Sequence, residues 1–413
     1  MRIVHVLGYF QPEFGYEEYY TARRQAILGH DVHVVASNMY FPFKDLGTLL
    51  EGAGAKDASR RRPVGTERCE GFTIHRLPKV METFYDLILV GGLGELLEEL
   101  RPDVVHAHEP RQGTPAMAAM HKDLGFALVI DQHGYESSYG GDGSVRDAAV
   151  RAEYDIMRRP MSNYAFARAD AIIAVTEQSK RFLVEHHGVD SSRVTVLPLG
   201  VETDIFHAMP REGARLRGEM GLEDGEALMV TAGRLEPAKG IERFIRALSG
   251  LPDKKGLRWR LLIIGSGDRD YLARLKGMAA GLEPGRVEFA PFQPKERLPE
   301  YFSAADVGLW GKASITILEA MACGLPVVTT DVGGNAEVVC RDEIGSIVPF
   351  GDARALQQAL DAALDKDWDR AAIIEYARAN QWDKRVAQLL RAFDALLAAP
   401  TSAARPAPTA ARQ

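Results

Sequence analysis

Short apolar segments rich in valine and isoleucine alternate with helical patterns along almost the whole chain, and this alternation constrains the fold more than any other feature. Most of these segments lack the every-second-residue alternation of a half-exposed strand, so they are typical of parallel strands buried on both faces. A first series of strands is expected at 2–7, 31–36, 104–107, 127–131, 171–175 and 194–197. A second series is expected at 227–232, 260–264, 287–290, 307–309 and 326–329.

Helices are expected between these strands, at 17–28, 241–248, 270–280, 315–322 and 353–364. Strands that alternate with helices predict an α/β fold with doubly wound parallel sheets. The 413 residues are enough for two domains, each with its own core. We predict Rossmann-like domains at 1–200 and 201–380, a helix at 381–399 that returns to the first domain, and a disordered tail at 400–413.

Charge and cysteine content narrow the classes of function. A net charge of −7 disfavours a nucleic-acid binder, which normally carries a positive field. The three cysteines are too few and too far apart for a disulfide framework or a zinc knuckle, and they favour a reducing cytosol. The first residues form a strand pattern, and no apolar run is long enough to span a bilayer. We expect a cytoplasmic protein, with peripheral contact to the inner face of a membrane left open.

The loop after the strand at 227–232 carries two cations at the carboxyl end of a sheet, where ligands of such folds bind. Gly233 allows a tight turn there. Arg234 and Lys239 lie five residues apart and could neutralise a diphosphate. Two solvated surface cations are an equally good interpretation of the spacing alone.

The loop before the helix at 315–322 has similar properties. Ser314 is a plausible N-cap, and the first-turn amides of Ile315 and Thr316 can receive phosphate oxygens. Glu319 can accept hydrogen bonds from both ribose hydroxyls, as acidic residues do in dinucleotide folds. The alternative is an acidic residue that the helix dipole favours.

A third loop, Gly265-Ser266-Gly267, permits close backbone approach to a base or ribose, although this spacing of glycines is weak evidence. The Asp268-Arg269-Asp270 segment that follows imitates a metal-binding motif. Its place at the start of a helix favours capping, and no metal site is predicted.

Taken together, these segments resemble the retaining glycosyltransferases of family 4, which have the GT-B fold. The most specific match is GRLEPAKG at 233–240. Further matches are LPLGVETDIF at 197–206, LEAMACGLPVV at 318–328, PDVVHAH at 102–108 and GHDVHVV at 29–35.

The resemblance implies a role for each matching residue. Arg234 and Lys239 would bind the donor diphosphate, Glu319 would hold the ribose, and His133 would contact the donor sugar. Gly15 matches a glycine of the loop that approaches the donor phosphate and the acceptor.

The chain departs from the family pattern at two positions. Tyr16 stands where a second glycine is frequent, and Gly311 stands where the first of two glutamates normally contacts the transferred sugar. Without that glutamate, fewer contacts to the transferred sugar are expected, and His133 would have to supply more of them.

Two further groups of residues have open interpretations. His106 and His108 can face the same side of a strand and could bind a metal, but the sequence identifies no third ligand, so polar groups at a strand end are the better interpretation. The basic segment Arg60-Arg61-Arg62 is either a solvated loop or a surface for an anionic lipid or acceptor.

The sequence therefore predicts a retaining glycosyltransferase that uses a UDP- or GDP-sugar donor and requires no cofactor. Its acceptor would be a glycan, a lipid-linked or a small molecule, with polysaccharide assembly as the usual setting, and closure of the two domains would exclude water. The alternatives are a sugar-nucleotide epimerase on the same fold and a non-catalytic sugar-nucleotide-binding protein.

Overall fold

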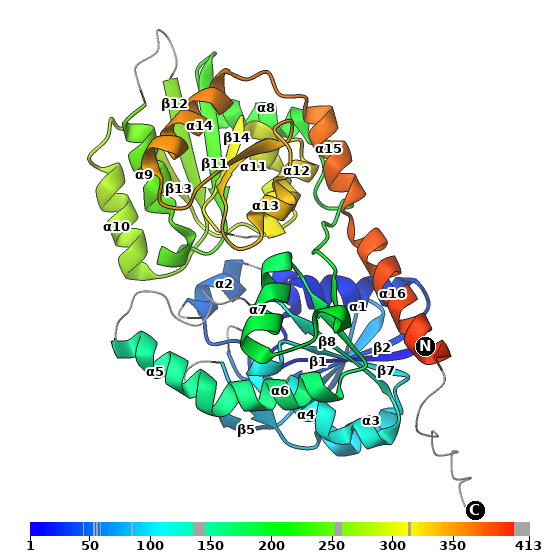
Figure 1. Cartoon of the computed structure of the whole chain (residues 1–413). Coiled ribbons are helices and arrows are strands. Elements are labelled where there is room, and N and C mark those ends of the chain that lie inside the picture. The colour runs from blue at the N-terminus through cyan, green and yellow to red at the C-terminus, as the bar shows by residue number, and fades with distance from the viewer. Residues whose placement is uncertain are drawn as a thin grey trace, which may run out of the picture. The chain divides into compact units, whose positions relative to one another are not determined.

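The computed structural model describes residues 1–43, 45–52, 54, 57, 59–83, 86–134, 145–251, 258–312 and 315–399 (Figure 1). Its contacts divide the chain into two compact units. Unit 1 comprises Met1–Pro42, Arg60–Pro198 and Arg385–Gln413, and unit 2 comprises Phe43–Ser59 and Leu199–Lys384. The predicted first domain included 43–59, which the contacts instead group with unit 2. The tail predicted at 400–413 lies outside the described residues.

Unit 1 contains an eight-stranded sheet in the order β10-β9-β8-β7-β1-β2-β4-β3. All neighbours are parallel except β3 and β4. The strands are β1 (Arg2–Val6), β2 (Asp31–Ser37), β3 (Gly65–Cys69), β4 (Phe72–Leu77), β7 (Val104–His108), β8 (Ala127–Gln132), β9 (Ala171–Ala174) and β10 (Val194–Val196). A separate hairpin pairs β5 (Lys79–Glu82) with β6 (Ile88–Val90).

The helices of unit 1 are α1 (Glu17–Ile27), α3 (Leu93–Leu100), α4 (Thr114–Ala118), α5 (Val145–Glu153), α6 (Arg159–Arg168) and α7 (Glu177–His187). The last helix of the chain, α16 (Trp382–Ala398), also contributes to this unit. Its residues Val386, Leu389 and Phe393 are buried in one apolar cluster with Ile3 and Val104 of the central strands. Helix α16 is therefore part of the apolar core around strands β1 and β7.

Unit 2 contains a wholly parallel sheet in the order β13-β12-β11-β14-β15-β16. Its strands are β11 (Glu226–Ala232), β12 (Arg258–Ile264), β13 (Val287–Ala290), β14 (Val307–Trp310), β15 (Val327–Thr330) and β16 (Gly345–Val348). Its helices are α2 (Leu46–Gly52), α8 (Pro210–Glu219), α9 (Ile241–Ser249), α10 (Arg269–Ala279), α11 (Leu298–Ala304), α12 (Ile315–Ala322), α13 (Asn335–Val338), α14 (Ala353–Asp365) and α15 (Arg370–Ala379).

Helices cover both faces of this sheet. Along β11, Leu228 and Val230 belong to the apolar cluster that includes residues of α8, α11, α12 and α15, whereas Met229 belongs to the cluster with α9, α10 and α14. A strand buried on both faces needs apolar residues at successive positions, which explains why the strand segments lack alternation. The arrangement confirms the predicted doubly wound fold class.

Strand order reverses once in each sheet, between β1 and β7 in unit 1 and between β11 and β14 in unit 2. Loops on the carboxyl side of such a reversal diverge to opposite faces and leave room for a ligand. Among the described residues, no helix combines the length and hydrophobicity that a membrane span requires.

Candidate functional site

A small cleft opens at the point in unit 2 where the strand order reverses. It is lined by residues from the end of β11, from the following loop and from the end of β14: Thr231, Ala232, Gly233, Arg234, Lys239, Ile241, Trp310 and Gly311. The sequence predicted three of these as donor-binding residues, namely Gly233, Arg234 and Lys239. The fold therefore brings both predicted cations to one cleft at the expected edge of the sheet.

Lys239 lies close to two other positively charged side chains. Burial lowers its pKa, the positive charges of Lys312 and Arg234 lower it further, and Glu236 acts in the opposite direction. A partly buried ammonium beside two other cations is electrostatically unfavourable unless an anion joins it. The local charge therefore suits a phosphate ligand.

Arg234 is held by a ring and a carboxylate but keeps unused hydrogen-bonding capacity. Its guanidinium carbon lies 4.3 Å from the centre of the Phe43 ring, and Nη2 lies 3.5 Å from Glu236. Its buried Nε has no hydrogen-bond partner among the described residues. A buried donor without a partner carries a free-energy cost that a ligand oxygen would remove.

The glycines of the neighbouring loop pack against protein backbone. A Cβ atom on Gly265 would lie 1.9 Å from the carbonyl oxygen of Gly233, and one on Gly267 would lie 2.2 Å from that of Leu235. Backbone hydrogen bonds from Gly233 to Ile264 and from Leu235 to Ser266 hold the two loops together. The close approach predicted at Gly265 is therefore made to Gly233, and this packing explains the glycine without a ligand.

Asp268 caps α10, as the sequence predicted. Its Oδ1 accepts hydrogen bonds from the backbone N–H groups of Asp270 at 3.1 Å and Tyr271 at 3.0 Å. In the segment that imitates a metal-binding motif, Asp268 therefore acts as the N-cap of a helix.

Glu319 is a buried carboxyl group on α12. Burial raises its pKa to about 7, although a hydrogen bond from Thr316 and the charge of Lys295 favour the ionised form. Of the other predicted residues here, Ile315 begins the helix, and Ser314 lies outside the described residues. Glu319 is not among the described residues that line the Arg234–Lys239 cleft, so its ribose role stays a prediction.

Gly311 has no room for a side chain. A Cβ atom there would lie 2.4 Å from the backbone carbonyl oxygen of Lys239. The Gly311 carbonyl in turn accepts a hydrogen bond from the Thr330 hydroxyl at 2.7 Å. In the family pattern this position carries a sugar-binding glutamate. Here the space for its side chain is occupied by the backbone of the loop that carries Arg234 and Lys239, which we call the cation loop.

In unit 1, His133 follows β8 and faces two carboxylates. Its Nε2 lies 2.8 Å from Glu17 Oε2 and 3.4 Å from Asp131 Oδ1. Burial alone would lower the pKa of His133, but Glu17 and Asp131 together raise it well above the ordinary value. The backbone N–H groups of His133 and Gly134 both donate to Glu109 Oε1, at 2.5 and 2.8 Å, which fixes the loop that carries the ring.

A buried group of imidazoles lies behind this loop. The parallel register sets His5 of β1 beside His106 of β7, and His108 beside Asp131 of β8. His5 is the third potential metal ligand that the sequence did not identify, because only the strand order brings it to the other two. Its Nδ1 lies 2.8 Å from His108 Nε2. That distance suits a hydrogen bond, whereas nitrogen ligands of one tetrahedral zinc lie about 3.3 Å apart.

The glycine loop of unit 1 has the predicted backbone freedom. Gly15 ends the turn Pro12–Phe14 with a φ of 62°, in the left-handed region that glycine adopts without strain. The next residue, Tyr16, is exposed. A bulky ring is thus presented where the family pattern often has a second glycine.

The predicted basic patch is partly used inside unit 1. Arg60 forms an ion pair with Glu82, and its Nε donates to the Tyr40 carbonyl at 2.7 Å. The guanidinium carbon of Arg62 lies 5.2 Å from the centre of the Tyr40 ring. These contacts tie two of the three arginines to the protein itself.

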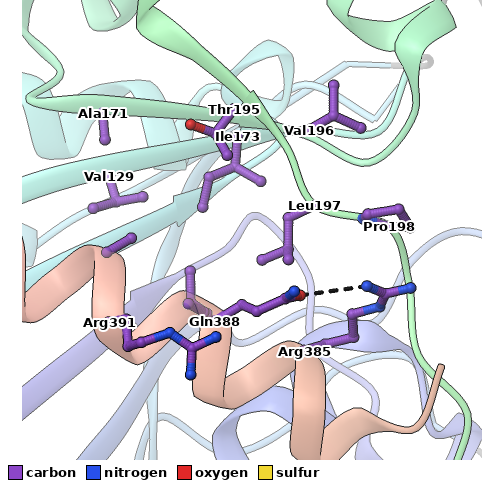
Figure 2. Close-up of a pocket in the computed structure, with 12 residues that line it drawn as sticks. Val129, Ala171, Ile173, Thr195, Val196, Leu197, Pro198, Arg385, Gln388 and Arg391 are labelled. Carbon is purple, nitrogen blue, oxygen red and sulfur yellow. Dashed lines mark hydrogen bonds between the residues drawn. The ribbon is translucent and has the colours of Figure 1, made fainter. Parts of the chain in front are cut away.

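A larger cavity, of about 330 Å³, lies between α16 and strands β8 to β10 of unit 1 (Figure 2). Its walls combine apolar side chains such as Ile173 and Leu389 with Arg385 and Arg391, and Arg385 Nη1 donates to Gln388 Oε1 at 3.3 Å. None of the residues predicted as donor-binding lines it. We therefore do not assign the donor to this cavity.

Known proteins resemble this chain in sequence and in fold. The D-inositol 3-phosphate glycosyltransferase of Acidothermus cellulolyticus is 34% identical over 321 residues, which cover 73% of this chain and 69% of that protein. Two solved structures share the fold with TM-scores of 0.70. They are sucrose-phosphate synthase from Thermosynechococcus elongatus, 20% identical with coverage of 96% and 99%, and HepE of Anabaena in complex with UDP, 19% identical with coverage of 96% and 100%.

Two family models divide the chain between them. The model described as Glycosyltransferase Family 4 matches residues 19–205, and the model described as Glycosyl transferases group 1 matches residues 214–380. Together with the relative from Acidothermus, these matches show that the chain belongs to glycosyltransferase family 4, the glycosyl transferases of group 1, and is a glycosyltransferase with the GT-B fold.

Proposed function

We propose that this glycosyltransferase takes a sugar from a UDP- or GDP-sugar and transfers it with retention of configuration. The observation that carries the proposal is the cleft of unit 2 lined by Arg234 and Lys239, the cation cleft. Lys239 is partly buried there and has a lowered pKa, and the buried Nε of Arg234 has no hydrogen-bond partner among the described residues, so an anion in the cleft would stabilise both side chains. Arg234 can bind a phosphate through two nitrogens, and Lys239 supplies a point charge. The complex of HepE with UDP supports a uridine nucleotide as the first donor to test.

In the proposed reaction, the bond between the sugar C1 and the diphosphate oxygen breaks, and the diphosphate keeps the electron pair. Arg234 and Lys239 stabilise the charge that develops there, which is a large term in catalysis. The acceptor hydroxyl oxygen forms the new bond to C1, and its proton passes to the departing phosphate oxygen. This sequence needs no protein nucleophile, and we propose that it needs no metal or other cofactor.

We propose a small phosphorylated polyol as the first acceptor to test, since relatives are named D-inositol 3-phosphate glycosyltransferases. A glycan or a lipid-linked acceptor at a membrane surface forms the second set. A cytoplasmic setting agrees with the three cysteines, all of which carry free thiols in the structure.

The decisive experiment measures donor binding and transfer separately. A thermal-shift series with UDP- and GDP-sugars should raise the melting temperature, because a ligand at a hundred times its Kd adds about 2.7 kcal/mol of stability. Transfer is then followed with the acceptor panel, with and without EDTA. A strict requirement for divalent metal in binding, or donor conversion without an acceptor, would contradict the proposal.

A further inference from the structure

His133 has more negative charge around one ring nitrogen than a neutral imidazole requires. Glu17 Oε2 and Asp131 Oδ1 both face Nε2, and the Asp131 carboxyl is almost completely buried, with 1% of its side chain exposed. None of these three atoms forms a hydrogen bond with a described residue, so both carboxylates act on the ring through their charge, which favours a hydrogen on Nε2 over a lone pair there. The open question is whether the second ring nitrogen, Nδ1, carries a hydrogen as well.

The network behind Asp131 determines its charge. His5 Nε2 lies 2.7 Å from Gln25 Oε1, which can only accept, so His5 carries its hydrogen on Nε2 and presents a lone pair at Nδ1. Burial keeps the pKa of His5 well below its ordinary value, so the ring stays neutral. The lone pair on His5 Nδ1 then requires His108 to donate from Nε2, at 2.8 Å.

The other nitrogen of His108, Nδ1, lies 2.5 Å from Asp131 Oδ2, although neither atom forms a hydrogen bond within the described part of the chain, so Asp131 acts on this ring through its charge. Burial opposes a charge on His108, but Asp131 and the acidic residues of α1 raise its pKa. Burial alone would raise the pKa of Asp131, but the charges of His108 and His133 hold it well below the ordinary value, so the carboxyl group is ionised. One carboxylate oxygen, Oδ2, faces both His106 at 3.1 Å and His108, and the other, Oδ1, lies 3.4 Å from His133 Nε2.

The other charged groups near His133 do not cancel the negative charge that Glu17 and Asp131 place beside its ring. On β7, His108 lies beside Asp131, and Glu109, which follows this strand, uses its oxygens for two backbone N–H groups and for Arg111. On α1, Glu18 is another acidic neighbour, whose pKa burial raises. On α7, the packed residue is Ser179, whose hydroxyl donates to the His133 carbonyl at 3.2 Å. No described residue forms a hydrogen bond with Nδ1 of His133, and a quarter of the side chain is exposed.

We propose that Glu17 and Asp131 are positioning residues that keep His133 doubly protonated, so that its Nδ1–H donates to a phosphate or hydroxyl oxygen of the glycosyl donor. The inference rests on the proposed function for the identity of the ligand, although the charge state of the ring does not depend on it. A neutral ring would leave Nδ1 as an acceptor and a potential base. An imidazolium is instead a cation and a donor, which assists the departure of an anion.

Nuclear magnetic resonance of the full chain with ¹³C-labelled histidine tests the charge state without any activity assay. The His133→Gln variant assigns the signal, which should titrate well above the ordinary pKa of 6.5 in the wild-type protein. In Glu17→Gln and in Asp131→Asn the midpoint should move down toward that value, because each removes one carboxylate. Glu99→Gln, an exposed change on α3 of the same unit, is the matched control and should leave the midpoint unchanged.

Asp131→Asn removes a buried charge and can lower stability, so Glu17→Gln provides the second, less buried test. A wild-type midpoint at or below 6.5, or an unmoved midpoint in a natively folded Glu17→Gln protein, would overturn the inference. Transfer assays give a separate readout: Glu17→Gln should lose about threefold or more of its rate between pH 6 and pH 8 relative to wild type. Absence of any transfer with a normal titration shift would refute the proposed function and leave the positioning role intact.

Discussion

The backbone carbonyl oxygen of Lys239 occupies the space that a side chain at Gly311 would need, 2.4 Å from the position of its Cβ atom. The cation loop and the end of β14 are therefore in direct contact through backbone atoms. Any side chain at 311 must displace the segment that carries Lys239.

We expect Gly311→Ala to lower the free energy of unfolding by roughly 1–3 kcal/mol, the usual cost of forcing an extra carbon into a packed site. The same variant should weaken donor binding, because Lys239 moves with its backbone. Urea unfolding and a thermal-shift titration measure the two effects. Gly218→Ala on α8 is the control: a Cβ atom there meets nothing within 4 Å, so this change should not destabilise the protein. Equal stability of both variants would contradict the packing argument.

We expect Arg234→Ala and Lys239→Ala each to lower turnover at least about tenfold, equivalent to roughly 1.4 kcal/mol of activation free energy. The reason is the loss of positive charge where the diphosphate departs. Initial-rate kinetics at fixed donor concentration provide the measurement. Arg246→Ala removes an exposed cation from α9 in the same unit and should keep its rate. Wild-type turnover in both site variants would refute the phosphate assignment.

The carboxyl group of Glu319 should make donor affinity depend on pH near neutrality. Its pKa of about 7 means that the group gains its charge between pH 6 and pH 8, and an ionised carboxylate is the better acceptor for ribose hydroxyls. Affinity should rise over this interval in the wild type, and the rise should flatten in Glu319→Gln. Since burial raises this pKa from 4.5 to about 7, the folded state holds the proton more tightly than the unfolded chain, so the apo protein should lose stability through this group as the pH rises from about 4.5 to 7. An identical pH profile in the variant would exclude the ribose role.

Two half-buried histidines with lowered pKa values, His75 and His187, should make unit 1 sensitive to acid. Burial lowers the pKa of His75 and of His187 to about 4, while the unfolded chain binds these protons near pH 6.5. The unfolded state therefore holds more protons than the folded state below pH 6.5, and each group should cost about 1 kcal/mol of stability by pH 5.5. Urea unfolding at pH 7.5 and pH 5.5 provides the test. His187→Gln should reduce the difference between the two values.

The strand pattern allowed the fold class to be predicted because buried parallel strands have a direct compositional signature. The segments expected at 2–7 and 227–232 appear as β1 and β11 with a shift of one residue at an end. The pair β3–β4 and the hairpin β5–β6 did not show this signature, since β3 and β5 are largely exposed edge strands.

The cation cleft could also be predicted, because Arg234 and Lys239 lie on one short loop whose position follows from the strand before it. Contacts between segments that lie far apart in the sequence could not be predicted. His5 meets His108 only because β1 and β7 are neighbours in the sheet, and Glu17 meets His133 although 115 residues lie between them in the chain. The need for glycine at 265 could not be predicted either, since it depends on the carbonyl oxygen of Gly233 in the loop after the neighbouring strand.

Helix α16 determines the order in which the protein can mature during synthesis. Unit 2 is complete once Lys384 has been made, whereas the core around Ile3 and Val104 still lacks Val386, Leu389 and Phe393. We therefore expect the first unit to leave the ribosome with part of its apolar interior uncovered and to finish folding last, after the second unit. A chain that stops at residue 384 would release a folded second unit attached to an unfinished first one.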